Sequence, residues 1–189
     1  MDHVRLSDGV VTLTPFRAAD IDAHLAGEDE LLVRWLSGGP STRAGTEEYV
    51  RRCTAQWVHR GPARVFGIRT GPEPVLAGTI DLRFAMPCLG PGQVNIAYGL
   101  YPAWRGRGLV TRAVRLVGRY AAQEGATEGV IRVDPENLAS AAVARRAGFR
   151  YAGRVMEPTG NRLDRYVRRL AETPAEAPAG ARTAAAGAL

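Results

Sequence analysis

A basic, glycine-spaced loop in the middle of the chain carries the residue types that bind phosphate. Gly106 and Gly108 alternate with Arg105 and Arg107, after an apolar run that ends at a proline and before an amphipathic stretch. Glycines let the backbone curl around an anion, and the start of a helix adds free N–H groups and partial positive charge. Arginines add forked donors for phosphate oxygens. This order of residues predicts a phosphate site, with an ordinary glycine turn between strand and helix as the alternative.

Two common nucleotide-binding motifs do not fit this loop. The chain contains no lysine, so the P-loop of nucleotide triphosphatases is absent. Thr111 stands where a dinucleotide-binding fingerprint has its third glycine, and the loop follows several predicted strands instead of the first one. The loop therefore predicts a phosphate-bearing ligand other than ATP or NAD.

A second polar cluster follows the next predicted strand. Residues 129–133 are apolar and β-branched, and a turn signal begins at Asp134. Asn137 is a good N-cap for a helix over 138–147, and Ser140 falls in the first turn of that helix. The pattern puts an amide and a hydroxyl at the end of a buried strand.

Together the two segments carry a family resemblance. R-G-x-G-L at 105–109 and V-x-x-x-N-x-x-S-x-x-V-A-R-R-x-G-F at 133–149 resemble the GCN5-related N-acetyltransferases, especially the branch that acetylates ribosomal protein N-termini. Residues 10–170 follow the family's order of elements. The resemblance implies an α/β (α+β) fold with a mixed, mostly antiparallel central sheet, flanked by helices. The sheet is expected to splay between its fourth and fifth strands, residues 93–101 and 129–133.

The resemblance also implies a reaction and a coenzyme. An acetyl group would pass from acetyl-CoA to a primary amine, on a protein N-terminus or a small molecule, by direct attack in a ternary complex. The pantetheine arm would lie in the wedge between the splayed strands, and the pyrophosphate on amides at the helix start. Asn137 would hold the pantetheine, cap its helix, or do both. The expected coenzyme-binding residues are Ala97, Tyr98, Gly99, Leu100, Arg105, Gly106, Arg107, Gly108, Leu109, Val110, Thr111, Asn137 and Ser140.

Two departures from the family pattern affect the expected catalytic roles. Ala144 stands where many relatives have a tyrosine that protonates the thiolate, so Ser140 is the expected acid, against a plain first-turn serine. Asn95 stands where many relatives have a glutamate, and an amide cannot act as a base. By similarity to the ribosomal-type branch, Glu157 is the first candidate for the base.

Other parts of the mechanism stay open at this stage. Asp81 and Asp134 compete with Glu157 for the base, as does a relay of water or backbone groups. A strand N–H within 97–99 is expected to donate to the thioester oxygen. The acceptor is expected among 28–45, 85–92 and 157–163. The two departures also support an alternative function, a coenzyme A-binding sensor or regulatory module without turnover.

The rest of the sequence predicts a single domain over 1–170 and a disordered, Ala- and Pro-rich tail over 171–189. The helix before the first hairpin is expected to start at Thr46. Strands are predicted at 10–16, 63–70, 74–84, 150–156 and 164–170, and further helices at 18–26, 46–60 and 108–124.

Composition narrows the function classes. The chain has 189 residues, of which 46% are hydrophobic, and no apolar run long enough to span a membrane. Cys53 and Cys88 lack metal-site spacing and are expected to be free thiols in the cytoplasm. The net charge is +6, but all 25 basic residues are arginine, as a GC-rich genome produces, and no basic run alternates with aromatic residues. We therefore expect no nucleic-acid partner, no membrane and no metal, while the resemblance allows a homodimer.

Overall fold

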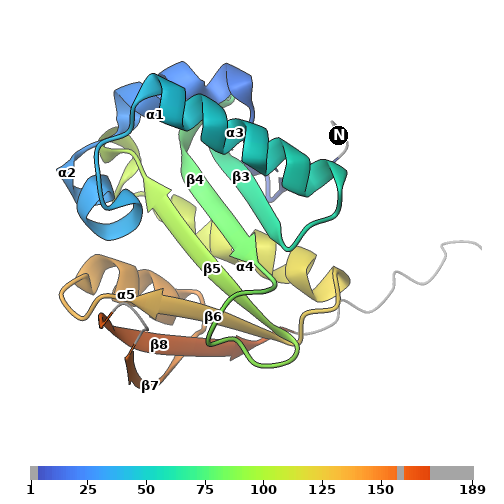
Figure 1. Cartoon of the computed structure of the whole chain (residues 1–189), viewed down its shortest axis with the longest axis vertical. Coiled ribbons are helices and arrows are strands. Elements are labelled where there is room, and N and C mark those ends of the chain that lie inside the picture. The colour runs from blue at the N-terminus through green and yellow to red at the C-terminus, as the bar shows by residue number, and fades with distance from the viewer. Residues whose placement is uncertain (1–3, 157–159, 171–189) are drawn as a thin grey trace, which may run out of the picture.

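In the computed structural model, which describes residues 4–156 and 160–170, the chain folds around one eight-stranded sheet (Figure 1). The strand order is β1-β2-β3-β4-β5-β6-β8-β7, and every neighbouring pair is antiparallel except β5 and β6. The expected fold is thus confirmed. Glu157 and the predicted tail over 171–189 lie outside the described residues. The strands are β1 Leu6–Ser7, β2 Val11–Pro15, β3 Ala63–Thr70, β4 Val75–Arg83, β5 Gln93–Leu100, β6 Glu128–Val133, β7 Arg150–Met156 and β8 Arg162–Arg169.

Helices cover both faces of the sheet. In Figure 1, α3 crosses in front of β3 and β4, and α4 runs behind the sheet. Short helical turns fill the connections, including a π-helical turn, η2, that continues α2. The helical elements are η1 Ala18–Asp20, α1 Ile21–Gly27, α2 Glu30–Leu32, η2 Val33–Ser37, α3 Arg43–Val58, η3 Pro102–Trp104, α4 Leu109–Gln123 and α5 Leu138–Arg146.

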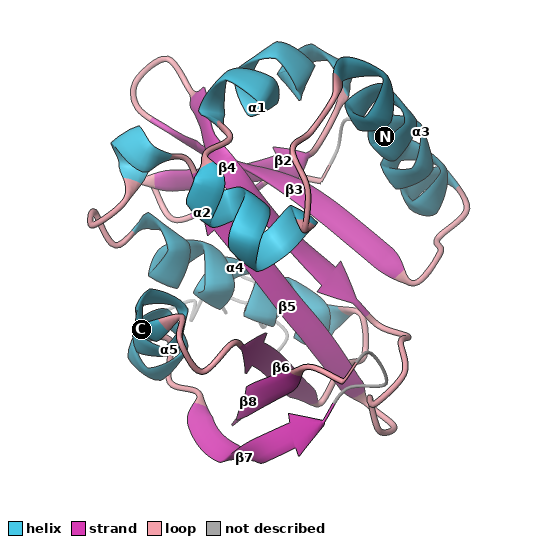
Figure 2. Ribbon diagram, turned by 60° about the vertical axis from the view of Figure 1, so that its left-hand side comes forward, coloured by secondary structure: helices cyan, strands magenta, loops and turns pink. Residues whose placement is uncertain are grey.

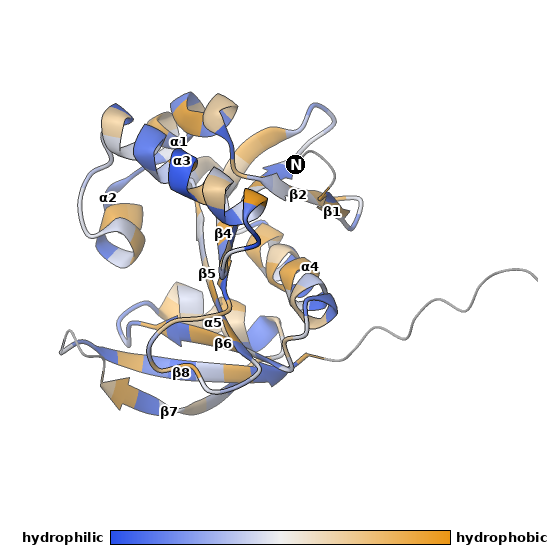
Figure 3. Cartoon of the chain, turned by 45° about the vertical axis from the view of Figure 1, so that its right-hand side comes forward, coloured by the Kyte–Doolittle hydropathy of each residue, from blue (hydrophilic) through white to orange (hydrophobic). Residues whose placement is uncertain are grey.

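The amphipathic helix α4 fixes the glycine loop against the core. On one face of the helix, Val114, Val117 and Ala121 are fully buried, whereas Arg115 and Arg119 on the other face are exposed to solvent. Figure 3 shows this apolar residue pattern along α4. Burying such an apolar stripe is the main source of helix stability in a globular protein. The start of α4 is therefore held rigidly beside β5.

The parallel pair β5–β6 opens into a wedge. Its ladder joins only Gln93, Val94 and Asn95 to residues 128–130. Beyond Asn95, β5 stays paired with β4, while β6 stays paired with β8. The two strands run apart in Figure 1, so the predicted splay between 93–101 and 129–133 is confirmed.

Two local expectations differ from the structure. The helix expected from Thr46 begins at Arg43, because the extended Thr42 caps it by accepting a hydrogen bond from the Gly45 N–H at 3.1 Å. Thr46 is buried inside the helix, and its hydroxyl donates to the Thr42 carbonyl oxygen at 2.9 Å. The strand β1 at the sheet edge was not predicted, because two residues carry no periodic signal.

Candidate active site

A cavity of about 870 Å³ fills the wedge. Its walls are the diverging ends of β5 and β6, the glycine loop, the start of α4, one face of α5 and the α2–η2 segment. Of the residues expected to bind the coenzyme, all line this cavity except Arg107. The structure therefore brings the two sequence motifs to one site.

The glycine loop forms an open cradle at one end of the cavity. Gly106 and Gly108 have φ angles of 76° and 73°, which L-residues with a side chain rarely adopt. A Cβ built on either one would meet no atom within 4 Å, so the space above the loop is open. Among the described residues, none accepts a hydrogen bond from the N–H groups of 106–111. These free donors at the start of α4 suit a bound phosphate or diphosphate.

The loop arginines have different roles from one another. Arg105 holds Asp29 through two hydrogen bonds of 2.7 Å, and its Nε donates to the Leu100 carbonyl oxygen at 3.0 Å. Its donor fork is thus directed at protein groups instead of the cradle. The Arg107 guanidinium lies 5.1 Å from the centre of the Trp104 ring, and Arg112 pairs with Asp8 at 2.9 Å. Of these three arginines, Arg107 alone makes no hydrogen bond or ion pair with the described residues.

Backbone groups of β5 face the wedge in alternation. The Tyr101 N–H donates to the Ala77 carbonyl oxygen next to β4, at 3.0 Å. Hydrogen-bonding direction alternates along an antiparallel strand, so the N–H groups of Ala97 and Gly99 also point to β4. The N–H groups of Ile96 and Tyr98 point the other way, into the wedge. Of the residues 97–99 expected to supply a donor, Tyr98 is the one whose N–H faces the wedge.

Tyr98 also bridges the wedge with its side chain. Its hydroxyl donates to the Ser140 carbonyl oxygen at 3.1 Å and accepts from the Ser140 Oγ at 3.2 Å. Burial raises the pKa of Tyr98 to about 12, although the hydrogen bond with Ser140 acts in the opposite direction. The phenol therefore stays protonated at neutral pH and can act as a donor. The sequence indicated Tyr98 only as a coenzyme-binding residue.

Two asparagines form hydrogen bonds at the edge of the wedge, Asn95 from β5 and Asn137 at the start of α5. The Asn137 side chain accepts from the Ser140 N–H at 3.0 Å, so its predicted role as N-cap is confirmed. Asn137 also lines the cavity. Asn95 is buried where the ladder ends, and its side-chain oxygen accepts from Nε of Arg132 at 3.1 Å. It supports the wall of the wedge, in agreement with its exclusion as a base.

The three candidate bases lie in different surroundings. Asp134 lines the cavity, and its Oδ1 accepts from the Glu136 N–H at 2.9 Å. Asp81 lies outside the cavity lining, where burial raises the pKa of its carboxyl and Arg83 donates to it at 3.0 Å. Glu157 lies outside the described residues. Of the two described carboxylates, Asp134 alone is close to the wedge.

The cavity is also lined by residues outside the predicted set. Arg146 lines it, whereas its neighbour Arg145 turns to the Tyr166 hydroxyl at 3.1 Å. Residues 31–36 of α2 and η2 form a further wall, and Arg34 pairs across the wedge with Glu136 at 2.5 Å. Two adjacent arginines at 145 and 146 were a weak sequence signal that one of them faces the cavity. No sequence signal indicated that Arg34 pairs with Glu136.

The described residues can also be inspected for a metal site and for a membrane-spanning helix. Within 4–156 and 160–170, no group of three His, Cys, Asp or Glu side chains is arranged to hold a metal ion. In the same part of the chain, no helix combines the length and apolar character that crossing a membrane requires. Cys53 is buried, Cys88 is exposed, and both are free thiols.

Comparisons with known proteins agree with this geometry. The family model described as an acetyltransferase (GNAT) domain matches residues 11–150, whereas no curated protein sequence matches the chain. A Salmonella typhimurium acetyltransferase that modifies the N-terminal serine of ribosomal protein L7/L12 shares 20% identity. It superposes with a TM-score of 0.76, covering 89% of this chain and 100% of its own.

Two other solved structures have the same fold with different acceptors. A spermidine N-acetyltransferase from Vibrio cholerae, solved with CoA and spermine, has 14% identity and a TM-score of 0.69, covering 86% of this chain and 97% of its own. The aminoglycoside acetyltransferase AAC(6')-Ib, solved with coenzyme A, has 22% identity and a TM-score of 0.70, covering 84% and 94%. The wedge, the glycine cradle and the match over 11–150 together show that the chain belongs to the GNAT family of acetyltransferases, as its sequence motifs predicted.

Proposed function

We propose that this protein is an acetyl-CoA-dependent N-acetyltransferase that acetylates a primary amine by direct attack in a ternary complex. The observation that carries the proposal is the continuity of the cavity, which joins the glycine cradle to the splayed edge of β5. A donor with a diphosphate at one end and an extended thioester arm at the other has the shape of this space. When bound, acetyl-CoA supplies an acyl group already activated as a thioester.

The residues at the cradle fit the coenzyme's phosphates. The N–H groups of Arg107, Gly108, Leu109 and Val110 would hold the pyrophosphate, because no described residue competes for them. Arg107 and Arg146 would add charge at the rim of this site. Ile96 and Tyr98 would pair with the pantetheine amides in the manner of an added strand, since their backbone groups face the wedge. Asn137 would contribute its side-chain N–H₂, because its oxygen already caps α5.

The residues beside the splayed edge suit acyl transfer. The Tyr98 N–H is the donor that would stabilise negative charge on the acyl oxygen. The Ser140 hydroxyl would turn its proton from Tyr98 to the departing thiolate. The Tyr98 hydroxyl would then turn its own proton from the Ser140 carbonyl oxygen to the Ser140 Oγ, so two hydroxyls act in series. This pair would serve in place of the tyrosine that Ala144 replaces.

The amine must lose a proton before it attacks, and two carboxylates are proposed as alternatives for this step. Asp134 lies at the wedge, and Glu157 is retained from the resemblance to ribosomal-type relatives. The variants Asp134→Asn and Glu157→Gln separate them through the pH dependence of kcat/KM. If one variant loses the acidic limb of its pH profile, the carboxylate replaced in that variant is the base. If both variants keep the limb, proton removal from the amine is assigned to water.

The remaining expectations belong to the same proposal. The catalytic domain would extend over 1–170, with the Ala- and Pro-rich segment 171–189 as a tail outside it. Acceptors would be small-molecule amines or protein N-termini, not nucleic acid. A cytoplasmic location would keep Cys53 and Cys88 reduced. Homodimerisation would be tested by sedimentation.

The decisive experiment measures free thiol released from acetyl-CoA across a panel of amines and N-terminal peptides. Calorimetry of coenzyme A binding is carried out alongside. Thiol release with at least one acceptor, dependent on the acceptor concentration, is expected. Tight coenzyme binding without release on any acceptor would instead indicate the sensing module, and failure to bind coenzyme A would refute both functions.

A further inference from the structure

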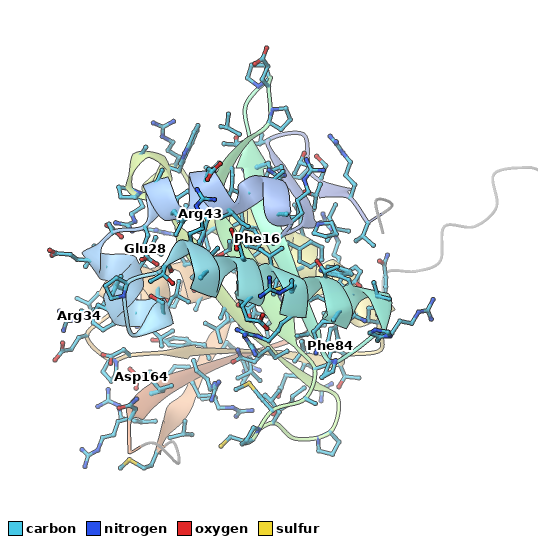
Figure 4. All side chains as sticks on the ribbon, turned by 45° about the horizontal axis from the view of Figure 1, so that its top comes forward. Phe16, Glu28, Arg34, Arg43, Phe84 and Asp164 are labelled. Carbon is cyan, nitrogen blue, oxygen red and sulfur yellow. The ribbon has the colours of Figure 1, made fainter. Side chains whose placement is uncertain are left out.

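The α2–η2 segment forms a wall of the cavity to which the proposed reaction assigns no role. Asp29, just before α2, is held by Arg105 after the end of β5. Arg34 of η2 pairs at 2.5 Å with Glu136, which follows β6. Figure 2 shows the segment in front of β5, and Figure 4 shows Glu28 and Arg34 on the same side of the molecule. The wall is therefore attached beyond the ends of both strands that open the wedge.

The wall meets β5 at Gly99. A Cβ built on Gly99 would lie 2.4 Å from Cδ1 of Leu36 and 2.5 Å from Cδ2 of Leu32, so the tips of the two leucines occupy the place of a side chain. Gly99 directly follows Tyr98, whose N–H faces the wedge and is the proposed donor to the acyl oxygen. Consecutive Cα atoms are about 3.8 Å apart. The wall therefore begins one residue away from the proposed position of the acyl group.

Much of this wall is apolar and uncovered. Leu31 and Leu36 are 49% and 46% exposed, although both line the cavity together with Trp35. Large apolar side chains that are exposed inside a concave site favour a ligand that covers them, because burial of apolar surface is favourable. An acetyl group has one methyl group beyond its carbonyl carbon, so it can cover only a small part of this surface. A longer carbon chain on the same carbonyl would cover more of it.

We propose that the α2–η2 wall binds the carbon chain of the acyl donor, and that the protein binds uncharged acyl thioesters of coenzyme A longer than acetyl more tightly than acetyl-CoA. This inference rests on the proposed function and concerns the donor of the same reaction. The transfer keeps its balance with a longer chain. The amine nitrogen bonds to the acyl carbon, the carbon–sulfur bond breaks with its electron pair left on sulfur, one proton leaves the amine, and one proton joins the released thiol.

Calorimetry of coenzyme A thioesters, without any acceptor, tests the proposal. Acetyl-, propionyl- and butyryl-CoA differ only in chain length, and free coenzyme A is the reference. We expect affinity to rise by about threefold for each added methylene, or about tenfold from acetyl to butyryl, because each methylene leaves water for an apolar surface. Equal or weaker binding of butyryl-CoA would overturn the proposal and would leave the wall to the acceptor.

The absence of an acceptor from this measurement separates the inference from the proposed function. A gain in affinity with chain length, without thiol release on any acceptor, would support the acyl site and refute the transferase function. Thiol release from acetyl-CoA without such a gain would support the transferase function and refute the acyl site. Failure to bind any of the thioesters would refute both. With a working acceptor at fixed concentration, KM for the donor should fall in the order acetyl, propionyl, butyryl.

Two wall variants and a control connect the chain-length effect to the α2–η2 segment. Leu36→Ala truncates a half-exposed side chain and should reduce the preference for butyryl-CoA over acetyl-CoA to about threefold or less. Leu31→Ala, at the other exposed position of the wall, should act in the same direction. In both variants the Kd for free coenzyme A should stay within about twofold.

Leu138→Ala is the matched control, since Leu138 is 75% exposed on α5 and does not line the cavity. It should keep the full preference for butyryl-CoA. An unchanged preference in both wall variants, or an equal loss in the control, would assign the chain-length effect to another part of the cavity and overturn the proposal.

Discussion

The Tyr98 hydroxyl and the Ser140 Oγ lie 3.2 Å apart across the wedge, one on β5 and the other on α5. This pair joins β5 to α5, the helix that follows β6, beyond the point where the β5–β6 ladder ends. The proposed reaction assigns protonation of the departing thiolate to the same two hydroxyls. The contact therefore links the structure of the wedge to its chemistry.

Removing the Tyr98 hydroxyl should slow turnover more than it weakens coenzyme binding. Tyr98→Phe keeps the ring in the wedge but leaves Ser140 without its hydroxyl partner, so kcat should fall by about tenfold, within the range of lost general acid catalysis. Ser140→Ala should have a similar effect, and the double variant should be little worse than either single one. Steady-state kinetics and calorimetry of coenzyme A measure these changes. Strictly additive losses would show that the two hydroxyls act separately.

A thioester donor with a more acidic leaving thiol provides the control for this assignment. A good leaving group needs no proton from the enzyme, so the Tyr98→Phe and Ser140→Ala variants should approach the wild-type rate with an aryl thioester. A deficit of the same size with both donors would assign the pair to positioning of the arm.

The raised pKa of Tyr98 should appear in the alkaline stability of the protein. Burial moves this pKa from an ordinary value of 10.0 to about 12, so the fold favours the neutral phenol. Its contribution to stability is complete below pH 10.0 and is lost as pH rises towards 12. The free energy of unfolding, from urea denaturation at mildly and strongly alkaline pH, should decline less steeply in Tyr98→Phe than in the wild type. Equal declines would mean that the phenol ionises freely.

The glycine cradle was predictable from sequence because its determinants are local. Glycine spacing, the following amphipathic helix and the capping amide of Asn137 each act over a few residues, and the structure shows all three. The start of α3 was misplaced by a few residues because Thr42 and Thr46 both precede a helical pattern. Only the extended backbone of Thr42 shows which of them is the cap.

The wall that α2 and η2 form along the cavity was not predictable in the same way. Residues 33–37 form a π-helical turn, which has no hydrophobic period of its own. Arg34 of this turn pairs with Glu136, which lies 102 residues further along the chain. The residues of the Tyr98–Ser140 contact are 42 residues apart. Arg105 was expected to bind phosphate because of its position in the loop, whereas the folded chain directs it at Asp29. Such pairings depend on the tertiary arrangement of the sheet, which a single sequence does not specify residue by residue.

Gly108 should be required for coenzyme binding more than for folding. Gly108→Ala puts a Cβ at a φ of 73°, and the strain should cost about 1 kcal/mol of stability. Gly125→Ala is a matched control, because Gly125 follows the same helix α4, has a φ of 92° and has equally open space around it. Both variants should lose similar stability by thermal unfolding. Only Gly108→Ala should lose affinity for coenzyme A, and an equal loss in both would contradict the cradle.

Asp29 and Arg105 should support the α2–η2 wall of the cavity, not the coenzyme site. Asp29 accepts two hydrogen bonds from Arg105 and one from the Leu32 N–H at 3.1 Å, so it fixes the start of α2. Asp29→Asn preserves an N-cap but weakens the pair, and Arg105→Gln removes the fork. In both variants KM for the acceptor should rise by about tenfold, while the Kd for coenzyme A stays within about twofold.

Hydrogen exchange provides a measurement of the same pair that is independent of turnover. The amides of α2 and η2 should exchange faster in Asp29→Asn and Arg105→Gln, whereas those of α4 should be unchanged. Arg107→Gln is the matched loop variant, since Arg107 lies over Trp104 and makes no ion pair with the described residues. It should weaken coenzyme binding and leave the exchange of α2 unaltered. If Arg105→Gln weakens coenzyme binding as much as Arg107→Gln does, Arg105 contacts phosphate and the wall has another support.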